Sequence, residues 1–175
     1  MAVTLLIGGV RAGKSAIAAQ LAEASRLPVV FIATAEAGDD EMAQRIARHR
    51  AERPPGWTTV EEPIDLATAF DGVDPDSAVV LDCLTLWSSN LMLAGMDDKD
   101  IEERAEDVAL RAARRPGPTF VVTNEVGAGV HPSSDLGRRF RDVLGRVNTI
   151  WSRNAADARL VVAGRTLALE PLPNP

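Results

Sequence analysis

The chain has 175 residues, 46% of them hydrophobic, which is enough for one domain with a substantial core. Its formal net charge of −6 excludes the broadly basic surface that draws proteins to nucleic acid or to anionic membranes, so we expect neither partner. The single cysteine, Cys83, excludes an internal disulfide, and the sequence shows neither a basic leader nor an apolar run long enough to span a membrane, so we expect a cytoplasmic protein.

The first predicted elements are a strand over residues 3–7 and a helix over residues 14–26, joined by a glycine-rich loop. Residues 8–15, GGVRAGKS, match the phosphate-binding pattern GxxxxGK[ST] in the strand–loop–helix context that it requires. Glycines let successive amide groups point at an anion, and the start of the helix adds a partial positive charge. The predicted phosphate-binding residues are Gly8, Gly9, Val10, Arg11, Ala12, Gly13, Lys14 and Ser15.

Two side chains in this loop have predicted roles of their own. Lys14 is expected to reach the β- and γ-phosphates of the nucleotide, and Ser15 is expected to bind Mg²⁺ through its hydroxyl. The structural alternative is a glycine turn whose lysine is merely solvated.

The next predicted strand covers residues 29–32 and is followed at its carboxyl end by Thr34. Open parallel sheets bind ligands outside this end of their strands, so the Thr34 hydroxyl either faces the nucleotide or caps a turn.

A helix with an acidic start is predicted from about residue 39 to the prolines that follow Arg53. It carries the one dense basic cluster of an acidic chain, in which Arg45, His49 and Arg53 share a helix face. This cluster is either a solvated face laced by pairs such as Glu41–Arg45, or a polyphosphate clamp whose histidine acts as a base or a nucleophile.

Residues 78–82, AVVLD, predict a buried strand that ends in an acid. P-loop proteins hold Mg²⁺ with such an acid, directly or through water. Alternatively, Asp82 caps the helix that begins at Cys83.

The remaining chain continues to alternate between strands and helices, which predicts an α/β fold with a mostly parallel sheet covered by helices on both faces, in one domain over residues 1–175. His131 is expected at the surface, in a loop. We expect Ala24 and Leu136 on the buried faces of the first and last helices. The other predicted strands cover residues 57–60, 119–123, 159–163 and 167–169, and the other helices cover residues 64–70, 85–93, 97–115 and 135–157.

Four stretches, in this order, closely resemble the bifunctional adenosylcobinamide kinase/adenosylcobinamide-phosphate guanylyltransferase family of cobalamin biosynthesis. They are GGVRAGKS, FIATAEAGDDEMAQRIARHRAERPPGW, VVLDCLTLWSSNLM and VVTNEVGAGVHPSSDLGRRFRDVLGRVN, and the resemblance spans residues 3 to about 170. It implies a RecA-like P-loop NTPase fold, Mg²⁺ dependence and a cytoplasmic homotrimer. It also implies two reactions: phosphorylation of adenosylcobinamide from ATP or GTP, and transfer of GMP from GTP to the product through a GMP–histidine intermediate.

The resemblance also assigns site residues. His49 corresponds to the guanylylated histidine, Glu61 and Asp82 complete the site, and the nucleotide is further contacted by Ala33, Thr34, Ala35, Arg50, Ala51, Glu52 and Arg53. Three positions depart from the family pattern. Arg48 stands where some members have a second histidine, Asp82 stands where others have Glu, and Arg165 stands where a smaller or apolar residue is expected.

Two rival functions remain open. A small-molecule P-loop kinase without a covalent step explains Lys14, Ser15 and Asp82 but gives the basic cluster around His49 no role. A nucleotide-gated interaction protein would use residues 97–115 as its partner surface.

Overall fold

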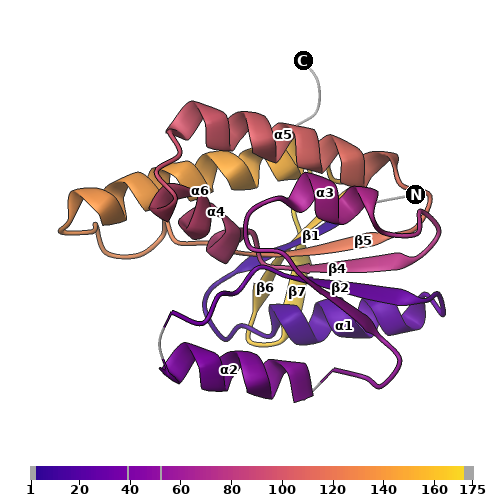
Figure 1. Cartoon of the computed structure of the whole chain (residues 1–175). Helices are drawn as coiled ribbons and strands as arrows, with labels where there is room; N and C mark the ends of the chain where they lie inside the picture. Colours follow the sequence, from indigo (N-terminus) through magenta and orange to yellow (C-terminus); the bar gives the residue numbers. More distant parts are fainter. Residues whose placement is uncertain (1–2, 39, 52, 172–175) are drawn as a thin grey trace.

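The computed structural model describes residues 3–38, 40–51 and 53–171, and within 40–51 it leaves the side chains of Glu41, Met42, Arg45, Arg48 and His49 undescribed. The described residues form one seven-stranded sheet with the strand order β3-β2-β4-β5-β1-β6-β7 (Figure 1). In chain order the elements are β1 (Val3–Gly8), α1 (Lys14–Ala24), β2 (Val29–Ala33), α2 (Asp40–Ala51), β3 (Thr58–Glu61), α3 (Leu66–Asp71), β4 (Ala78–Asp82), α4 (Leu84–Leu93), α5 (Asp98–Arg114), β5 (Thr119–Asn124), α6 (Asp135–Asn154), β6 (Asp157–Val162) and β7 (Arg165–Ala168).

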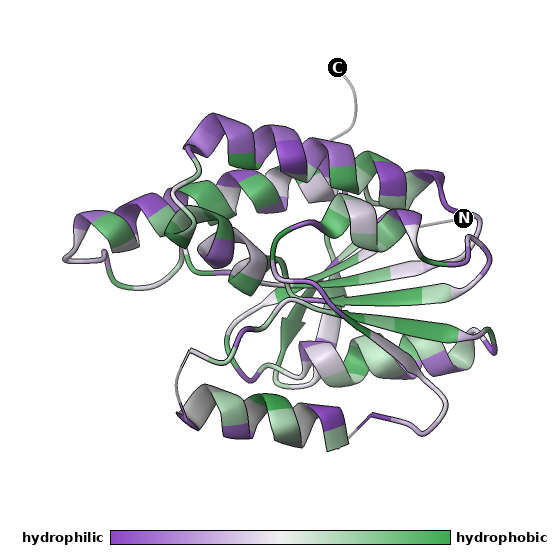
Figure 2. Ribbon diagram, viewed as in Figure 1, coloured by the Kyte–Doolittle hydropathy of each residue, from purple (hydrophilic) through white to green (hydrophobic). Residues whose placement is uncertain are grey.

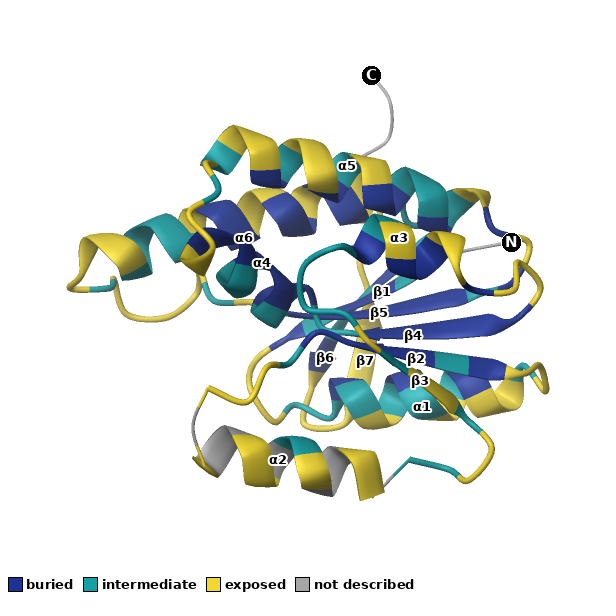
Figure 3. Cartoon of the chain, viewed as in Figure 1, coloured by how far each residue is buried: buried dark blue, intermediate teal, exposed yellow. Residues whose placement is uncertain are grey.

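The sheet is parallel except for β7, which pairs with β6 in the antiparallel sense. Figure 1 shows α1 and α2 on one side of the sheet and α3 to α6 on the other. The predicted α/β fold with helices on both faces is therefore confirmed. Because both faces are covered, the central strands are mostly apolar and buried, as the green segments of Figure 2 and the dark blue strands of Figure 3 show.

Successive residues of the central strands point to opposite faces and so belong to two separate cores. Leu5 and Val121 pack in the larger core, beneath α3 to α6. Leu6 and Val122 pack in the smaller core beneath α1. This alternation decides which strand-end residues lie on the α1 side, next to the glycine-rich loop.

Two of the predicted buried positions are wrong. In α1 the buried residues are Lys14, Ala18 and Ala22, and Ala24 is exposed, because the stripe that meets the sheet repeats every four residues from Lys14. In α6, Leu136 is 56% exposed, since the first turn of this helix extends beyond the sheet (Figure 1).

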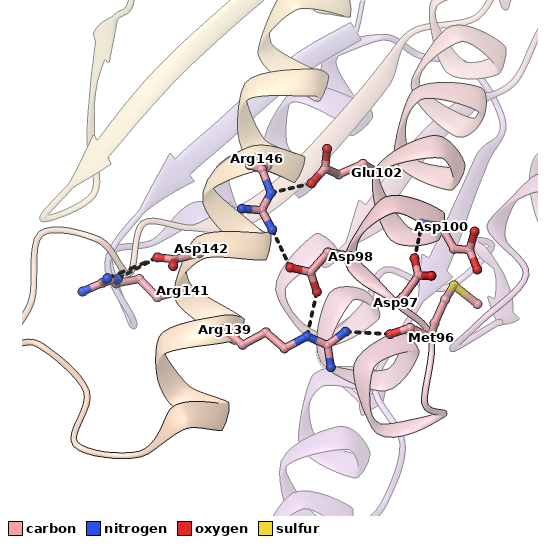
Figure 4. Close-up of polar contacts among 9 residues, drawn as sticks. All are labelled: Met96, Asp97, Asp98, Asp100, Glu102, Arg139, Arg141, Asp142 and Arg146. Atoms are coloured by element: carbon pink, nitrogen blue, oxygen red, sulfur yellow. Dashed lines mark hydrogen bonds and ion pairs between the residues drawn. The ribbon is translucent and has the colours of Figure 1, made fainter.

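The two long helices of the upper layer are tied together by ion pairs at the start of α5 (Figure 4). Asp98 accepts hydrogen bonds from Arg139 Nε at 2.6 Å and from Arg146 at 2.7 Å, and Arg146 also pairs with Glu102. Asp97 caps α5 by accepting from the Asp100 amide at 2.9 Å. These pairs are partly solvated, so each contributes little to the stability of the fold.

The final hairpin turns more tightly than the sequence predicts. Ala163 and Gly164 have φ values of +50° and +74°, which is the left-handed backbone of a two-residue hairpin turn. Strand β7 therefore begins directly after them, and Arg165 pairs with Val162 as its first, exposed residue. Nothing in the structure explains the charge at position 165. In the described part of the chain, no helix combines the length and the apolar composition of a membrane span.

Gly8 is the residue at which the sheet tolerates no side chain. It pairs with Val161 of β6, and a Cβ atom at position 8 would lie 2.2 Å from the Val161 carbonyl oxygen. We expect Gly8→Ala to destabilise the protein by about 3 kcal/mol, because the backbone of a central ladder has to shift. For a chain of this length that is a fall of roughly 6–12 °C in Tm, measured by thermal denaturation.

The matched control for this prediction is Gly9→Ala, since a Cβ atom at position 9 meets nothing within 4 Å. Equal melting temperatures for the two variants would contradict the proposed clash at Gly8.

Candidate nucleotide site

A cavity of about 700 Å³ lies at the carboxyl ends of the parallel strands, between the loop after β1, the first turns of α1, and the segment from α2 to Trp57. This is the end at which open parallel sheets bind ligands. Its polar lining includes Arg11, Lys14, Ser15, Glu23, Arg53, Glu61, Asp82, Thr85 and Asn124. Of the predicted loop residues, Val10 to Ser15 line the cavity. Gly8 and Gly9 do not line it, and their carbonyl groups accept hydrogen bonds from Lys14.

The ammonium group of Lys14 is held inside the loop. Only 6% of Lys14 is exposed, and its Nζ donates to the carbonyl oxygens of Gly8 at 3.0 Å and of Gly9 at 2.7 Å. Burial lowers the pKa of Lys14, and the nearby Cys83 and Asp82 partly oppose this shift. The loop carbonyls thus hold the cation at the place where a polyphosphate would be cradled.

The loop is supported from outside by the turn between β6 and β7. The Gly164 amide donates to the Ala12 carbonyl at 2.8 Å. Gly13 has a φ of +100°, and a Cβ atom there would lie 3.3 Å from the Gly164 Cα. The backbone of the loop is therefore packed against a hairpin that comes from the far end of the chain.

Asp82 is the last residue of β4 and lines the cavity together with Ser15. The residue at the N-cap of α4 is Cys83, and no side chain caps that helix. The alternative in which Asp82 serves as a helix cap is therefore wrong.

The Thr34 side chain joins the ends of two strands. It is fully buried, and its hydroxyl donates to the Cys83 carbonyl at 2.7 Å and accepts from the Cys83 amide at 2.8 Å. Its own amide donates to the Asp82 carbonyl at 3.1 Å. The hydroxyl thus holds Cys83, which is 49 residues away in sequence and next to Asp82, in place. It neither caps a local turn nor lines the cavity. Its neighbours Ala33 and Ala35 do line the cavity.

The predicted basic cluster divides into residues with different surroundings. The Arg53 guanidinium lies 3.9 Å from the centre of the Phe31 ring, inside the cavity lining, and donates to Thr59 Oγ1 at 3.0 Å. Burial, together with the charge of Arg50, lowers the pKa of Arg53, and Asp82 opposes this shift. Arg50 pairs with Glu61 at the end of β3.

The other predicted nucleotide contacts of this segment do not line the cavity or are not described. Ala51 is exposed, and the side chain of His49 and the whole of Glu52 lie outside the described residues. Among the described side chains of α2, Ile46 lines the cavity.

The cavity also contains residues that the motifs did not indicate. Trp57 and Phe31 form one apolar wall, with ring centroids 6.4 Å apart and tilted by 31°. Their sequence contexts are typical of strands and predict only an ordinary core role. Asn124 and Thr85 also line the cavity, on the side of the glycine-rich loop that we call its phosphate end. Of the two, the sequence indicates only Asn124, because it directly follows an apolar run.

Comparison with known proteins identifies the family. The model of the family described as cobinamide kinase / cobinamide phosphate guanyltransferase matches residues 4–169. The chain belongs to this family. Among curated relatives it is 41% identical to the bifunctional adenosylcobalamin biosynthesis protein CobP of Pseudomonas aeruginosa, over 96% of this chain and 98% of that protein. It is also 41% identical to the Escherichia coli protein CobU, over 91% and 95% of the two chains.

Solved structures with low sequence identity share the fold of this cobinamide kinase family member. A protein from Pyrococcus horikoshii superposes with a TM-score of 0.60 at 8% identity, covering 99% of this chain and 88% of that one. An ATPase of a bacterial type III secretion system superposes with a TM-score of 0.56 at 11% identity, covering 91% and 50%. The RadB recombinase superposes at 0.50 with 14% identity, covering 91% and 73%. The predicted RecA-like P-loop fold is therefore confirmed.

Cys83 offers a test of the cavity's electrostatics. Burial, together with the charge of Asp82, raises the pKa of its thiol from 9.0 to about 11. A raised thiol pKa contributes stability below pH 9.0 that is lost as the pH rises to about 11.

At pH 8 the thiolate fraction of Cys83 in the folded protein should be about 100-fold lower than in the unfolded chain, because each pKa unit is a factor of ten. We expect alkylation of the native protein to be slower by at least that factor, measured by mass spectrometry. Asp82→Asn should speed the labelling of native protein, and equal rates for native and unfolded chains would contradict the assignment.

Proposed function

We propose that this protein phosphorylates adenosylcobinamide with ATP or GTP and then transfers GMP from GTP to adenosylcobinamide phosphate, giving adenosyl-GDP-cobinamide. The observation that carries the proposal is that Lys14, Ser15 and Asp82 line one cavity at the strand ends, in a chain of the cobinamide kinase family. The same cavity contains Arg53 and an apolar wall of Phe31 and Trp57. It therefore offers cationic groups for a triphosphate and a flat surface for a nucleobase.

The first reaction needs little covalent chemistry from the protein. The acceptor hydroxyl attacks the γ-phosphorus, the bond to the β–γ bridging oxygen breaks, and a nucleoside diphosphate leaves while the hydroxyl proton passes to solvent. Lys14 and the amides at the start of α1 would hold the charge that shifts between phosphate oxygens. Positioning and charge stabilisation account for most of the rate enhancement in such reactions.

We also propose that the protein uses Mg²⁺. The Ser15 hydroxyl and the Asp82 carboxylate line the same cavity and are hard oxygen donors of the type that Mg²⁺ prefers. The described residues contain no group of three or more metal-ligating side chains, which suits an ion that takes its remaining ligands from phosphates and water. When bound, Mg²⁺ neutralises charge on the phosphates.

For the second reaction we propose His49 as the nucleophile. Its ring nitrogen attacks the α-phosphorus of GTP, a P–N bond forms, and the bond to pyrophosphate breaks. A phosphate oxygen of adenosylcobinamide phosphate then attacks the same phosphorus and the P–N bond breaks, which regenerates the histidine.

The placement of α2 supports this role. Ile46 and Arg53 both line the cavity. Position 49 follows Ile46 by three residues within α2, so positions 46 and 49 share a helix face. Arg53 would offset charge on the departing pyrophosphate.

The family resemblance further supports three proposals about the whole molecule. We propose that residues 1–175 act as one nucleotide-binding domain, that the protein assembles as a homotrimer, and that it works in the cytoplasm without nucleic-acid or membrane partners. The net charge of −6 is consistent with the absence of those partners.

Replacing His49 by Asn tests the covalent step. The variant should bind GTP and phosphorylate adenosylcobinamide, but it should lose the GMP adduct completely, because no neighbouring residue replaces a nucleophile. The measurement is retention of label from α-labelled GTP on denatured protein. The control is His131→Asn, since His131 lies exposed in a loop against Arg141.

An adduct that persists in His49→Asn, or that disappears in His131→Asn, would reject His49 as the nucleophile. A parent protein that forms no adduct but phosphorylates the substrate would instead be a small-molecule P-loop kinase.

Asp82→Asn tests the metal site. The change keeps the shape of the side chain and removes its charge, so we expect kcat to fall roughly 10²–10³-fold, with a higher Mg²⁺ requirement and little change in Tm. Asp71→Asn is the control, because Asp71 pairs with Arg111 on the surface, outside the cavity lining. A fall in Tm that matches the loss of activity would point to a structural role for Asp82.

A further inference from the structure

Asn124 is a polar residue of the phosphate end of the cavity that neither the motifs nor the family resemblance assign. It is the last residue of β5, the strand that lies between β1, which leads into the glycine-rich loop, and β4, which ends in Asp82. The residue is therefore placed between the two groups that the proposed kinase reaction uses at the phosphates.

Strand register sets the side of the sheet on which Asn124 lies. Asp82 pairs with Val122 in the parallel ladder, and Asn124 follows Val122 by two residues, so all three side chains point to the same face. Val122 packs in the core beneath α1, and all three residues line the cavity. Asn124 thus shares the α1 face with Asp82.

The register with β1 places Asn124 beside the lysine. Asn124 pairs with Gly8, and the Gly8 carbonyl accepts from Lys14 Nζ at 3.0 Å. A P-loop lysine reaches the β- and γ-phosphates of the nucleotide. Asn124 therefore lies beside the residue whose carbonyl holds the Lys14 ammonium.

Buried side chains from two helices fix the backbone of Asn124. Its amide donates to Thr85 Oγ1 of α4 at 2.8 Å, and its carbonyl accepts from Asn148 Nδ2 of α6 at 3.0 Å. Asn148 is itself held by the Thr123 hydroxyl, which donates to its Oδ1 at 2.7 Å. Thr85 and Asn148 are only 8% and 6% exposed.

This network orients the strand end without using the Asn124 side chain. Within the described part of the chain, the side-chain amide makes no hydrogen bond, although the residue is half-buried. A buried network that positions an unused polar group toward a cavity is the arrangement expected of a preorganised ligand contact.

We infer that the Asn124 side-chain amide donates to the γ-phosphate and positions it for attack by the acceptor hydroxyl. This inference rests on the proposed kinase reaction. The amide supplies a neutral donor, whereas a second cation would pair with Asp82 and compete for the metal. The transfer of GMP to His49 breaks the bond at the α-phosphorus, so it depends less on this contact.

Asn124→Ala tests the inference. The kinase rate is divided by the number of sites that form a GMP adduct at the end point, so that unfolded protein is not counted. We expect kcat for phosphorylation of adenosylcobinamide to fall about 10–100-fold, with the KM for nucleotide and the rate of adduct formation changed by less than about threefold. Asn124→Asp should be slower still, because it replaces a donor with a charge that repels phosphate. The control is Asn154→Ala, which removes hydrogen bonds to Glu106 and to the Ile150 carbonyl outside the cavity.

Two results would overturn the inference. One is a normal kcat in both Asn124 variants, and the other is an equal loss of the kinase and adduct reactions per folded site. Failure of the guanylyltransferase proposal is seen separately, because the parent protein would then form no adduct. The kinase rates are in that case expressed per site that binds nucleotide at saturation.

Discussion

The phosphate loop depends on a close approach between backbones that only glycine permits. At Gly8 the strand β1 lies so near to Val161 of β6 that a side chain does not fit, and at Gly13 the loop meets the hairpin turn at Gly164. Both contacts come from the same hairpin, β6–β7. The hairpin thus holds Ala12 and Gly13, which lead directly into Lys14 and α1.

The cavity brings cations and acids together at the ends of the strands. Arg11, Lys14 and Arg53 line it, and so do Glu23, Glu61 and Asp82. Burial lowers the pKa values of Lys14 and Arg53, and Asp82 opposes both shifts. An anionic ligand would relieve the cost of burying these cations, which favours binding of a polyphosphate over an empty site.

The parts of the site that the sequence predicted are those built from contiguous residues. The GGVRAGKS loop and the acid that ends β4 are local patterns, since their chemistry follows from neighbours in the chain. The roles of Thr34 and Asn124 depend on contacts between residues far apart, such as Thr34 with Cys83, and no local pattern encodes these. The same reason explains the error at Leu136: its spacing is that of a buried face, but the sheet does not extend beneath that turn.

The strand order has a consequence for how this protein folds during synthesis. Strand β1 is made first, yet its neighbours in the sheet are β5 and β6, whose residues begin at Thr119 and Asp157. Until those segments leave the ribosome, β1 has no partner strand on either side, and its apolar residues remain available for non-native contacts. The nucleotide loop therefore takes its final form late, and nucleotide affinity in a truncated nascent chain would appear only after residues near Gly164 have emerged, because the Gly164 amide completes the loop.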